Sequence, residues 1–480
     1  MATIENKNKI IFGVFWSYSE RFLVQLITVI ISIILARILT PEDYGLIAIV
    51  TVFITICDAF VTGGFGNALV QKKEAKAIDF NSFCWLSLLI SILLYFILYI
   101  IAPYIGFFYK KDILVALIRV MGLRIIFSAF NSLQQAYVQR KMLFKRFFFA
   151  TLGGTIFSAV LSIIAVYLKF GVWALVVQSI SNVVINTIIL FLINDWKPRF
   201  EFSYTSIKET WQYSFKIFLS TIIFIFKDNI RQLIIGKQFT SSDLAYYNQG
   251  KKFPNLLVSD IVECLGKVLF PVMSKEQENY EKIKKIMQKS IRISSFILNP
   301  CIIGFFTLSD TFTKVILTEK WLPCVPFMRI MCLVYITRSM TTIFQKGILA
   351  IGNSKINLIH EIVTSILTII FLFFAAFKLK NIFFIAWSYV IVMLIGLLIY
   401  IYYILRIFKY TIFEIINDYI PSFLISVLMG IIVYFVGKIN FNNFFILCLQ
   451  IIIGVIVYIL FAIIIKDDSF YFIKSYIKNR

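Results

Sequence analysis

The sequence predicts an all-α integral membrane protein of about fourteen transmembrane helices. Hydrophobic residues make up 60% of the 480 residues and charged residues only 15%, and the mean hydropathy is +0.88. A soluble protein of this size cannot bury so much apolar surface. Apolar stretches of about 20 residues, long enough to cross a bilayer core, recur from end to end. They do not alternate with polar residues, so they are typical of helices rather than barrel strands.

The apolar stretches give the helices in order, because each one is bounded by short polar connectors. The expected spans are 12–36, 44–66, 81–103, 113–137, 147–168, 171–193, 214–235, 243–268, 289–309, 325–351, 356–377, 381–404, 420–437 and 444–464. Between the eighth and ninth spans, residues 276–289 read EQENYEKIKKIMQK. This connector is expected to form a short amphipathic helix that is either solvated or anchored to the lipid surface.

The formal net charge of +22 is better explained by membrane topology than by nucleic acid, because Lys and Arg lie in loops between spans. Connectors on one side, such as residues 139–146 and 282–289, hold most of these residues. The imbalance predicts a multi-pass protein of the bacterial cell (inner) membrane with both termini in the cytoplasm. The N-terminus lacks a small-residue cleavage site, so the first helix is expected to remain in the mature protein.

An internal repeat predicts two matched halves. Thr40 and Asp43 recur two hundred positions later as Thr240 and Asp243, in the segment Gly236–Tyr247. A second echo pairs Gln135 with Gln345 and Lys145 with Lys355. The expected organisation is a lobe of six helices in 1–200, a pseudo-symmetric lobe of six in 201–410, and two further helices with a cytoplasmic tail in 411–480. The second corner has Ser241, Ser242 and Ala245 in place of Pro41, Glu42 and Gly45, so looser packing is expected there.

Polar residues follow helical spacing on one face of spans 1, 2, 4, 7, 8 and 10. Ionisable groups inside a membrane are costly unless they meet a partner or a water-filled cavity. The stripes are net basic, which favours a cationic cavity, while structural ion pairs and helix–helix hydrogen bonds remain the alternative. The candidate cavity residues are Arg21, Gln25, Arg119, Arg124, Asn131, Gln135, Lys216, Lys227, Arg231, Lys252, Asn255, Arg338 and Gln345.

A cationic cavity suits an anionic cargo, because guanidinium groups bind phosphate through two donors and lysine acts as a point charge. Inward carboxylates are candidates for binding a coupling ion, Na⁺ or H⁺, although each is also explained as a salt-bridge partner. These candidates are Glu20, Asp58, Asp228, Asp260 and Glu263. The single histidine, His360, lies on none of the striped spans and is interpreted as an interfacial residue.

The sequence contains no pattern that indicates catalysis or a cofactor. It has no Walker loop, no metal-ligand cluster and no long extracytoplasmic loop, and its seven cysteines are scattered through apolar runs. A secondary transporter is therefore favoured over an enzyme. A membrane polymerase or lipid-linked glycosyltransferase is the rival from another class, and it would need a sizeable outer loop for its active site.

Four motifs carry a family resemblance, together with the corner that contains Thr40 and Asp43. They are GGFGNALVQKKEA at 63–75, QRKMLFKR at 139–146, FGVWALVVQ at 170–178 and LFPVMSKEQ at 269–277. This combination resembles the Wzx-type polysaccharide flippases of the MOP exporter superfamily, strongly over spans 1 to 8. Such flippases have no universally fixed ligand residues, so the cavity residues above rest on helical faces alone.

The resemblance implies two six-helix lobes with a terminal helix pair, and alternating access driven by an ion gradient. It also implies that the cargo is an undecaprenyl-pyrophosphate-linked oligosaccharide, moved from the cytoplasmic to the outer leaflet for O-antigen, capsule or exopolysaccharide synthesis. Membrane lipids and the polysaccharide polymerase and chain-length machinery are the partners that it implies. A peptidoglycan lipid II flippase or a multidrug antiporter of the same superfamily remains an alternative.

Overall fold

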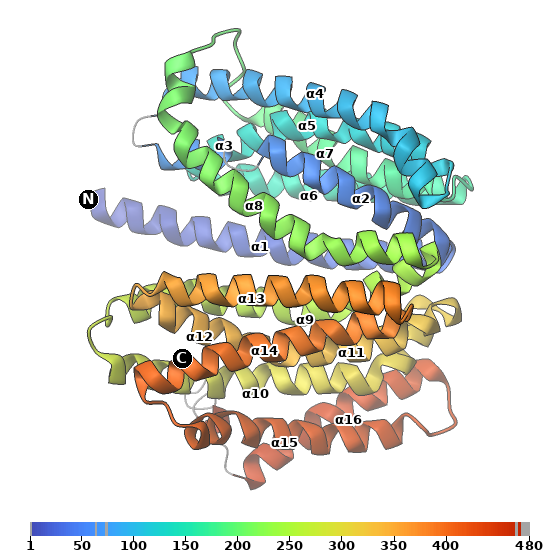
Figure 1. Cartoon of the computed structure of the whole chain (residues 1–480), viewed down its shortest axis with the longest axis vertical. Coiled ribbons are helices and arrows are strands. Elements are labelled where there is room, and N and C mark those ends of the chain that lie inside the picture. Colours follow the sequence, from blue (N-terminus) through green and yellow to red (C-terminus); the bar gives the residue numbers. More distant parts are fainter. Residues whose placement is uncertain (1, 63–64, 73–74, 466–468, 472–480) are drawn as a thin grey trace. The chain divides into compact units, whose positions relative to one another are not determined.

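The computed structural model describes residues 2–62, 65–72, 75–465 and 469–471. Within helices α1 (Ala2–Ile38), α3 (Phe65–Gln71) and α8 (Tyr204–Gln238), only the backbone is described for some residues. These are residues 2–15, 17, 18, 67, 68, 71, 209–214, 216, 217, 219, 220 and 224. The described chain consists of helices joined by turns, and no strand occurs in it (Figure 1). The all-α prediction is thus confirmed.

The chain divides into two compact units, residues 1–244 and 245–480. Unit 1 contains α1, α3, α8 and five further helices. These are α2 (Pro41–Thr62), α4 (Ala77–Tyr109), α5 (Ile113–Arg140), α6 (Phe144–Tyr167) and α7 (Trp173–Ile193). Helix α8 packs against α2 and α4. The predicted lobe boundaries at residues 200 and 410 remain a prediction, since the units of the structure are divided by a different criterion.

Unit 2 contains most of α9 (Ser241–Ser274) and seven further α-helices. These are α10 (Tyr280–Phe312), α11 (Val325–Ile336), α12 (Arg338–Ala350), α13 (Ser354–Phe373), α14 (Ile382–Phe408), α15 (Ile412–Val436) and α16 (Asn443–Ile464). Short segments of π- and 3₁₀-helix at Thr313–Leu317, Glu319–Cys324 and Phe374–Lys378 complete it. Helix α10 packs against α11, α12, α15 and α16, so it is the central helix of the unit.

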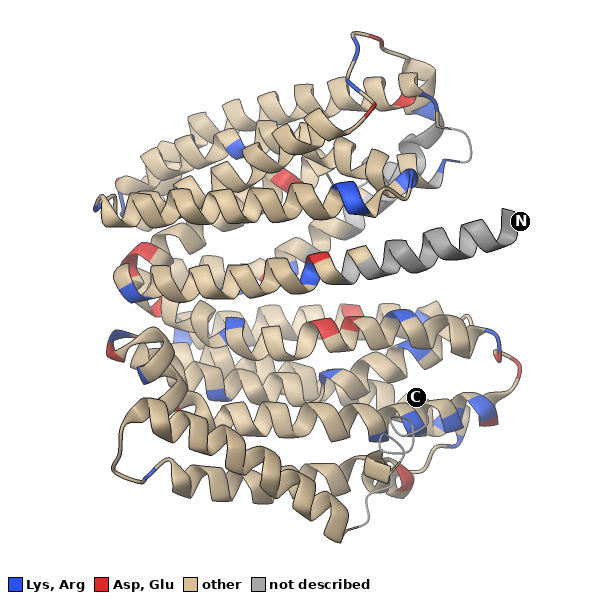
Figure 2. Ribbon diagram, turned by 180° about the vertical axis from the view of Figure 1, so that it is seen from behind, with Lys and Arg blue, Asp and Glu red and all other residues tan. Residues whose placement is uncertain are grey.

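Within the described residues, twelve segments are long and apolar enough to cross a membrane, where α11 and α12 count as one. The other two expected spans are α8 and α9, which are long helices but carry charges along their length, such as Lys227 and Arg231 in α8. Figure 2 shows that charged residues are sparse along the middle of most helices and gather near helix ends. The chain is therefore a multi-pass membrane protein whose helices match the expected order.

Two expected elements differ from the sequence prediction. The connector 276–289 does not form a separate amphipathic helix: after a turn, α10 begins at Tyr280 and continues through it. Its lysines are held by carboxylates, with Lys284 Nζ at 2.8 Å from Glu414 Oε1 and Lys282 Nζ at 2.6 Å from Glu276 Oε1. The expected span 325–351 is interrupted at Thr337, between α11 and α12. A sequence stripe does not reveal such a break.

The repeated corners have the same hydrogen bonds. Thr40 Oγ1 donates to Asp43 Oδ2 at 2.7 Å, and Thr240 Oγ1 donates to Asp243 Oδ2 at 2.7 Å. In both corners the backbone N–H of the aspartate donates back to the threonine hydroxyl, which is a reciprocal cap at the helix N-terminus. The internal repeat found in the sequence therefore corresponds to a repeated local structure.

The residue differences between the corners have a steric reason in unit 1. A Cβ atom on Gly45 would lie 1.8 Å from the backbone oxygen of Ser241, so only glycine fits at this position. The equivalent residue in the second corner, Ala245, is fully buried. The expectation of looser packing at the second corner is therefore not supported, because Ala245 is enclosed.

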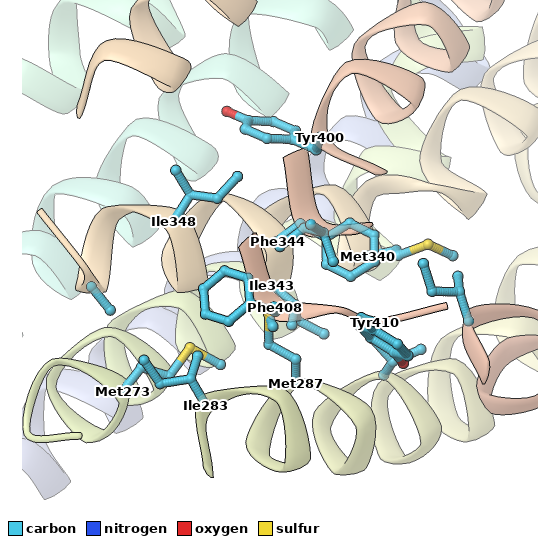
Figure 3. Close-up of a cluster of buried hydrophobic side chains, with 14 of the residues drawn as sticks. Met273, Ile283, Met287, Met340, Ile343, Phe344, Ile348, Tyr400, Phe408 and Tyr410 are labelled. Atoms are coloured by element: carbon cyan, nitrogen blue, oxygen red, sulfur yellow. The ribbon is translucent and has the colours of Figure 1, made fainter. Parts of the chain in front are cut away.

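A large apolar cluster holds α9, α10, α12, α14 and the start of α15 together (Figure 3). Its fully buried members include Met273, Met287, Phe344 and Tyr400. Methionine fills irregular gaps between helices because its side chain is flexible and polarisable. This cluster fixes the positions of α9 and α12, the two helices that carry the candidate site of unit 2.

Close helix packing in unit 2 predicts that Gly250→Ala is destabilising. A Cβ atom at this position would lie 2.4 Å from Phe327 Cβ, so α9 and α11 must separate, at a cost of about 1–3 kcal/mol. Gly304→Ala in α10 is the matched control, because its Cβ would lie 3.6 Å from Met429 Cε, in ordinary contact. Thermal unfolding in detergent should show a lower Tm for Gly250→Ala alone. Equal Tm values would contradict this packing.

Candidate functional site

Unit 1 contains an ion pair between three helices. Arg124 of α5 places Nη2 at 3.4 Å from Asp58 Oδ2 of α2, and its Nη1 donates to Ser179 Oγ of α7 at 3.1 Å. Both charged side chains are mostly buried, at 28% and 18% exposure. The sequence stripes placed these residues on separate helices and missed the pairing. Asp58 therefore neutralises the charge of Arg124, although the polar stripes of the sequence are net basic.

Two turns along α5, amide side chains join α5 to α7. Asn131 Nδ2 donates to Asn186 Oδ1 at 2.9 Å and lies 3.1 Å from Thr187 Oγ1, and Gln135 Nε2 donates to Asn131 Oδ1 at 2.5 Å. Asn131 and Gln135 were predicted to line a cavity, but in the structure Asn131 bonds to α7 and Gln135 bonds to Asn131 on its own helix. Hydrogen bonds between helices are the alternative that the sequence had left open.

The other candidates of unit 1 are distributed more widely. Arg119 lies over the ring of Tyr99 on α4, with Cζ at 4.1 Å from the ring centroid. Arg231 of α8 is buried, and Arg21 of α1 is exposed. Glu20 beside it is buried. The side chain of Lys216 lies outside the described residues.

The remaining residues predicted to line a cavity or bind an ion do not lie together at one site among the described residues. Gln25 and Lys227 are partly buried and Asp228 is exposed. In α9, Lys252 is partly buried, Asp260 is exposed, and Asn255 Oδ1 accepts a hydrogen bond from Ser259 at 2.5 Å. The thirteen predicted cavity residues therefore do not form a single cluster within either unit.

Unit 2 contains a pocket of about 520 Å³ between α9 and α12. Its lining residues are Ser259, Val262, Glu263, Gly266, Lys267, Phe270, Arg338, Thr342, Gln345 and Lys346. Three of these are basic and one is acidic, so the pocket carries a net positive charge. The acidic group is partly neutralised locally, because Glu263 Oε2 lies 3.9 Å from Lys267 Nζ. The pocket therefore favours an anionic ligand.

The sequence folds so that the basic residues converge on the pocket. Arg338 is the first residue of α12, directly after the break at Thr337, and Lys346 lies two turns further along, about 12 Å down the axis. The hydroxyl of Tyr419 donates to the carbonyl oxygen of Ile336 at 3.0 Å. Helix α15 thus contacts the chain at the break, next to the first pocket residue of α12.

A glycine lets α9 approach α12 at the pocket. A Cβ atom on Gly266 would lie 3.1 Å from Lys346 Cε and 3.4 Å from Thr342 Cγ2. Without that atom, the stem of Lys346 lies along α9, and its Nζ reaches 5.9 Å from the ring centroid of Phe270. This geometry leaves the ammonium group beside the pocket.

The pocket contains three of the residues predicted from sequence, Glu263, Arg338 and Gln345. Lys267 and Lys346 were not among the cavity residues predicted from sequence. Arg338, Thr342 and Lys346 are each four residues apart, so they lie on one face of the helix. This spacing defines a face more clearly than the alternative that joins Arg338 and Thr342 to Gln345. That signal was present in the sequence and could have added Lys346 to the candidate site.

The chemistry of the pocket fits an anion and not a metal ion. Arginine presents a planar pair of donors and lysine a point charge, both suited to phosphate oxygens. Ser259, Thr342 and Gln345 add hydroxyl and amide groups that bind hydroxyl-rich ligands. Among the described residues, no group of three or more His, Cys, Asp or Glu side chains is placed to hold a metal ion.

The fold defines the class of protein. A solved structure of the lipid II flippase MurJ, in an inward closed conformation, aligns with a TM-score of 0.75 at 18% identity, covering 95% of this chain and 99% of that one. An inward-facing multidrug resistance MATE family transporter of the MOP superfamily aligns with a TM-score of 0.63 at 16% identity, covering 81% and 96%. The chain thus has the fold of MOP superfamily transporters.

Sequence comparison then gives the family. Residues 34–326 match the polysaccharide biosynthesis protein family, and the chain belongs to that family. The teichuronic acid biosynthesis protein TuaB of Bacillus subtilis (strain 168) is 24% identical over 433 residues, 89% of this chain and 88% of that protein. The lipopolysaccharide biosynthesis protein WzxC of Escherichia coli (strain K12) is 20% identical over 69% and 68% of the two chains. The resemblance to Wzx-type transporters is confirmed.

The ion pair of unit 1 predicts strong coupling between Asp58 and Arg124. Removing one partner leaves the other charge poorly solvated, whereas removing both does not. Asp58→Asn and Arg124→Gln should therefore each lower the Tm, and the double variant should be more stable than the sum of the two losses predicts. A double-mutant cycle of thermal unfolding measures this coupling. Strictly additive losses would show that the pair does not stabilise unit 1.

Proposed function

We propose that this protein moves an oligosaccharide, linked to undecaprenyl pyrophosphate, from the cytoplasmic to the outer leaflet of the bacterial inner membrane. The observation that carries the proposal is the net-positive pocket between α9 and α12. Family membership supports the class of process, since related proteins are named for the biosynthesis of teichuronic acid and lipopolysaccharide, and one for succinoglycan biosynthesis transport. The protein acts as a secondary transporter in this proposal, not as an enzyme.

The pocket supplies the groups that a diphosphate headgroup needs. Arg338 binds phosphate oxygens through its two-donor fork, while Lys346 and Lys267 add point charges. Ser259 and Thr342 face the same space and are placed to hydrogen-bond sugar hydroxyls. Because each charge-assisted hydrogen bond contributes about 1.5–3 kcal/mol, two of them are enough to select a diphosphate over a neutral lipid headgroup.

The position of the pocket along the helices supports access from the cytoplasm. Helix α9 ends at Ser274 and α12 at Ala350, and the pocket residues lie in the second half of α9 and along α12. The adjoining connectors and helix ends hold Lys275, Lys355 and Lys409. By the positive-inside rule this basic end faces the cytoplasm. Both termini are assigned to the same compartment.

An ion gradient, of Na⁺ or H⁺, drives the alternating access that we propose. Asp58 is the best supported of the carboxylate candidates, because its side chain is mostly buried and its Oδ2 lies 3.4 Å from Arg124 Nη2. A carboxylate that is held in place inside a helix bundle is a suitable site for a proton or sodium ion. Glu20, Asp228, Asp260 and Glu263 remain candidates with weaker support.

Two rivals on the same scaffold differ in cargo. A multidrug antiporter that exports cations needs an acidic pocket, whereas this pocket is net basic. A lipid II flippase carries the same pyrophosphate anchor, so the pocket charge does not separate it from an oligosaccharide flippase. Growth of a lipid II flippase depletion strain that expresses this protein would favour that rival.

Transport in proteoliposomes tests the pocket assignment. We expect Arg338→Gln and Lys346→Gln each to slow transfer of a fluorescent polyprenyl-diphosphate-linked oligosaccharide about tenfold, because each removes a charge-assisted contact. Lys438→Gln is the matched control, because Lys438 lies over the ring of Tyr434 of α15, away from the two helices that line the pocket. This variant should transport at the wild-type rate. Wild-type rates in both pocket variants, at normal expression, would contradict the assignment.

Imposed gradients test ion coupling in the same vesicles. A sodium or a proton gradient alone should accelerate transfer by wild type, and Asp58→Asn should abolish that acceleration while leaving slow, gradient-independent transfer. Neutralising the carboxylate removes the ion site but keeps a similar shape beside Arg124. If neither gradient changes the wild-type rate, the protein is not driven by an ion gradient.

A further inference from the structure

Behind the pocket of unit 2, a chain of polar side chains leads from Gln345 to the single histidine. Gln345 Nε2 donates to Asn357 Oδ1 at 2.7 Å, and the hydroxyl of Tyr400 donates to the same oxygen at 2.8 Å. Since Asn357 accepts both bonds, its position determines where the amide of Gln345 lies at the pocket wall. The three side chains come from α12, α13 and α14.

Tyr400 is a rigid member of this chain. Its side chain is fully buried in the apolar cluster of unit 2, and Figure 3 shows its oxygen pointing away from the other labelled side chains. The ring is held by close packing on the cluster side, so the hydroxyl has little freedom to leave Asn357. A change in the electron density of the ring therefore changes the strength of the hydrogen bond that the hydroxyl donates to Asn357.

His360 lies against that ring. The two ring centroids are 4.3 Å apart, with an angle of 22° between the planes, and the imidazole is only 12% exposed. A Cβ atom on Gly396 would lie 2.7 Å from His360 Nε2, so α14 leaves space for the imidazole at this point. The sequence interpretation of His360 as an interfacial residue stays a prediction, and the structure adds that the ring packs against Tyr400 of α14.

Glu361, the next residue of α13, is a charged neighbour of His360. Glu361 Oε1 lies 3.5 Å from His360 Nδ1, and this nitrogen is buried without a hydrogen-bond partner. Of the neighbouring helices, α12 carries Arg338 and Lys346 and α14 carries Arg406, while Lys355 precedes the histidine on α13. A proton on the imidazole can thus form an ion pair with Glu361.

We propose that His360 is a positioning residue that makes anion binding in the pocket tighter at acidic pH. A positive imidazole stacked on Tyr400 draws electron density from the phenol ring, so its hydroxyl donates more strongly to Asn357. Asn357 then holds Gln345 in one position at the pocket wall. Histidine is the side chain whose charge changes between about pH 5 and 8. This inference rests on the proposed anion pocket.

Binding to the full-length protein in nanodiscs, at about pH 5.5 and about pH 8, tests the relay. The probe is citronellyl-diphospho-N-acetylglucosamine, because both of its phosphates are esterified and its charge is constant over this range. We expect wild type to bind roughly three- to tenfold more tightly at the lower pH, because one better-ordered hydrogen bond at the pocket wall changes affinity by about that factor. His360→Gln should bind equally at both, with the affinity of wild type at the higher pH.

Tyr400→Phe separates the relay from a simple charge effect. This variant keeps the ring that stacks on His360 but lacks the hydroxyl, so the pH dependence should disappear although the histidine is present. Tyr402→Phe is the matched control, because Tyr402 is an exposed residue of α14 and should keep the wild-type ratio. A Tyr400→Phe protein that retains the full pH dependence would overturn the relay.

The outcomes for wild type separate this inference from the proposed function. Equal binding by wild type at the two pH values, with clear affinity at both, overturns the role of His360 and leaves the anion pocket in place. An absence of binding at both values removes the pocket itself and both conclusions with it. Retention of the pH dependence by His360→Gln assigns the effect to another group and overturns the proposal.

Discussion

A charged side chain inside a membrane helix must meet a partner or reach water, and the two units of this protein meet that requirement in different ways. In unit 1, Arg124 is paired with Asp58 and bonded to Ser179, so its charge holds three helices together. In unit 2, Arg338 and Lys346 line an open pocket in which a single carboxylate faces three basic groups. The positive charge that remains is what a phosphorylated ligand needs.

The packing of unit 2 serves this pocket. The apolar cluster fixes α9 and α12, while Tyr419 of α15 donates a hydrogen bond to the carbonyl of Ile336, next to the break before Arg338. Helix α15 is itself fastened to α10 through Arg292 and Asp418, whose Nε and Oδ1 lie 2.5 Å apart. The C-terminal helix pair therefore contributes to the site indirectly, by holding the helix that contacts the chain at the break. Pocket geometry and helix packing depend on one another.

The fold could be predicted from sequence because its signal is repeated and local. Uniform apolar stretches give the order of the helices, and the repeated Thr and Asp of the corners correspond to identical caps in the structure. The site could be predicted only in part, because contacts between helices are not local. The face of α5 shows that Arg124 points inward, but not that Asp58, 66 positions earlier, lies beside it.

The types of residues in the sequence were also not enough to predict the candidate site. Asn131 and Gln135 have the spacing of cavity residues, yet Asn131 bonds to α7 and Gln135 bonds to Asn131, since an amide serves equally as a ligand or as a helix contact. The break at Thr337, which places Arg338 at the start of α12, carries no Pro or Gly that would mark it. The role of His360 depends on its contact with Tyr400, forty residues later, and on the space left by Gly396.

The central claim is that the pocket between α9 and α12 holds the diphosphate of the cargo. A structure of the protein in nanodiscs, bound to a short-chain polyprenyl-diphosphate-linked sugar, measures this most directly. The diphosphate should lie within hydrogen-bonding distance of Arg338 and Lys346, with the first sugar near Thr342 and Gln345. Density for the diphosphate elsewhere, with this pocket empty, would contradict the account.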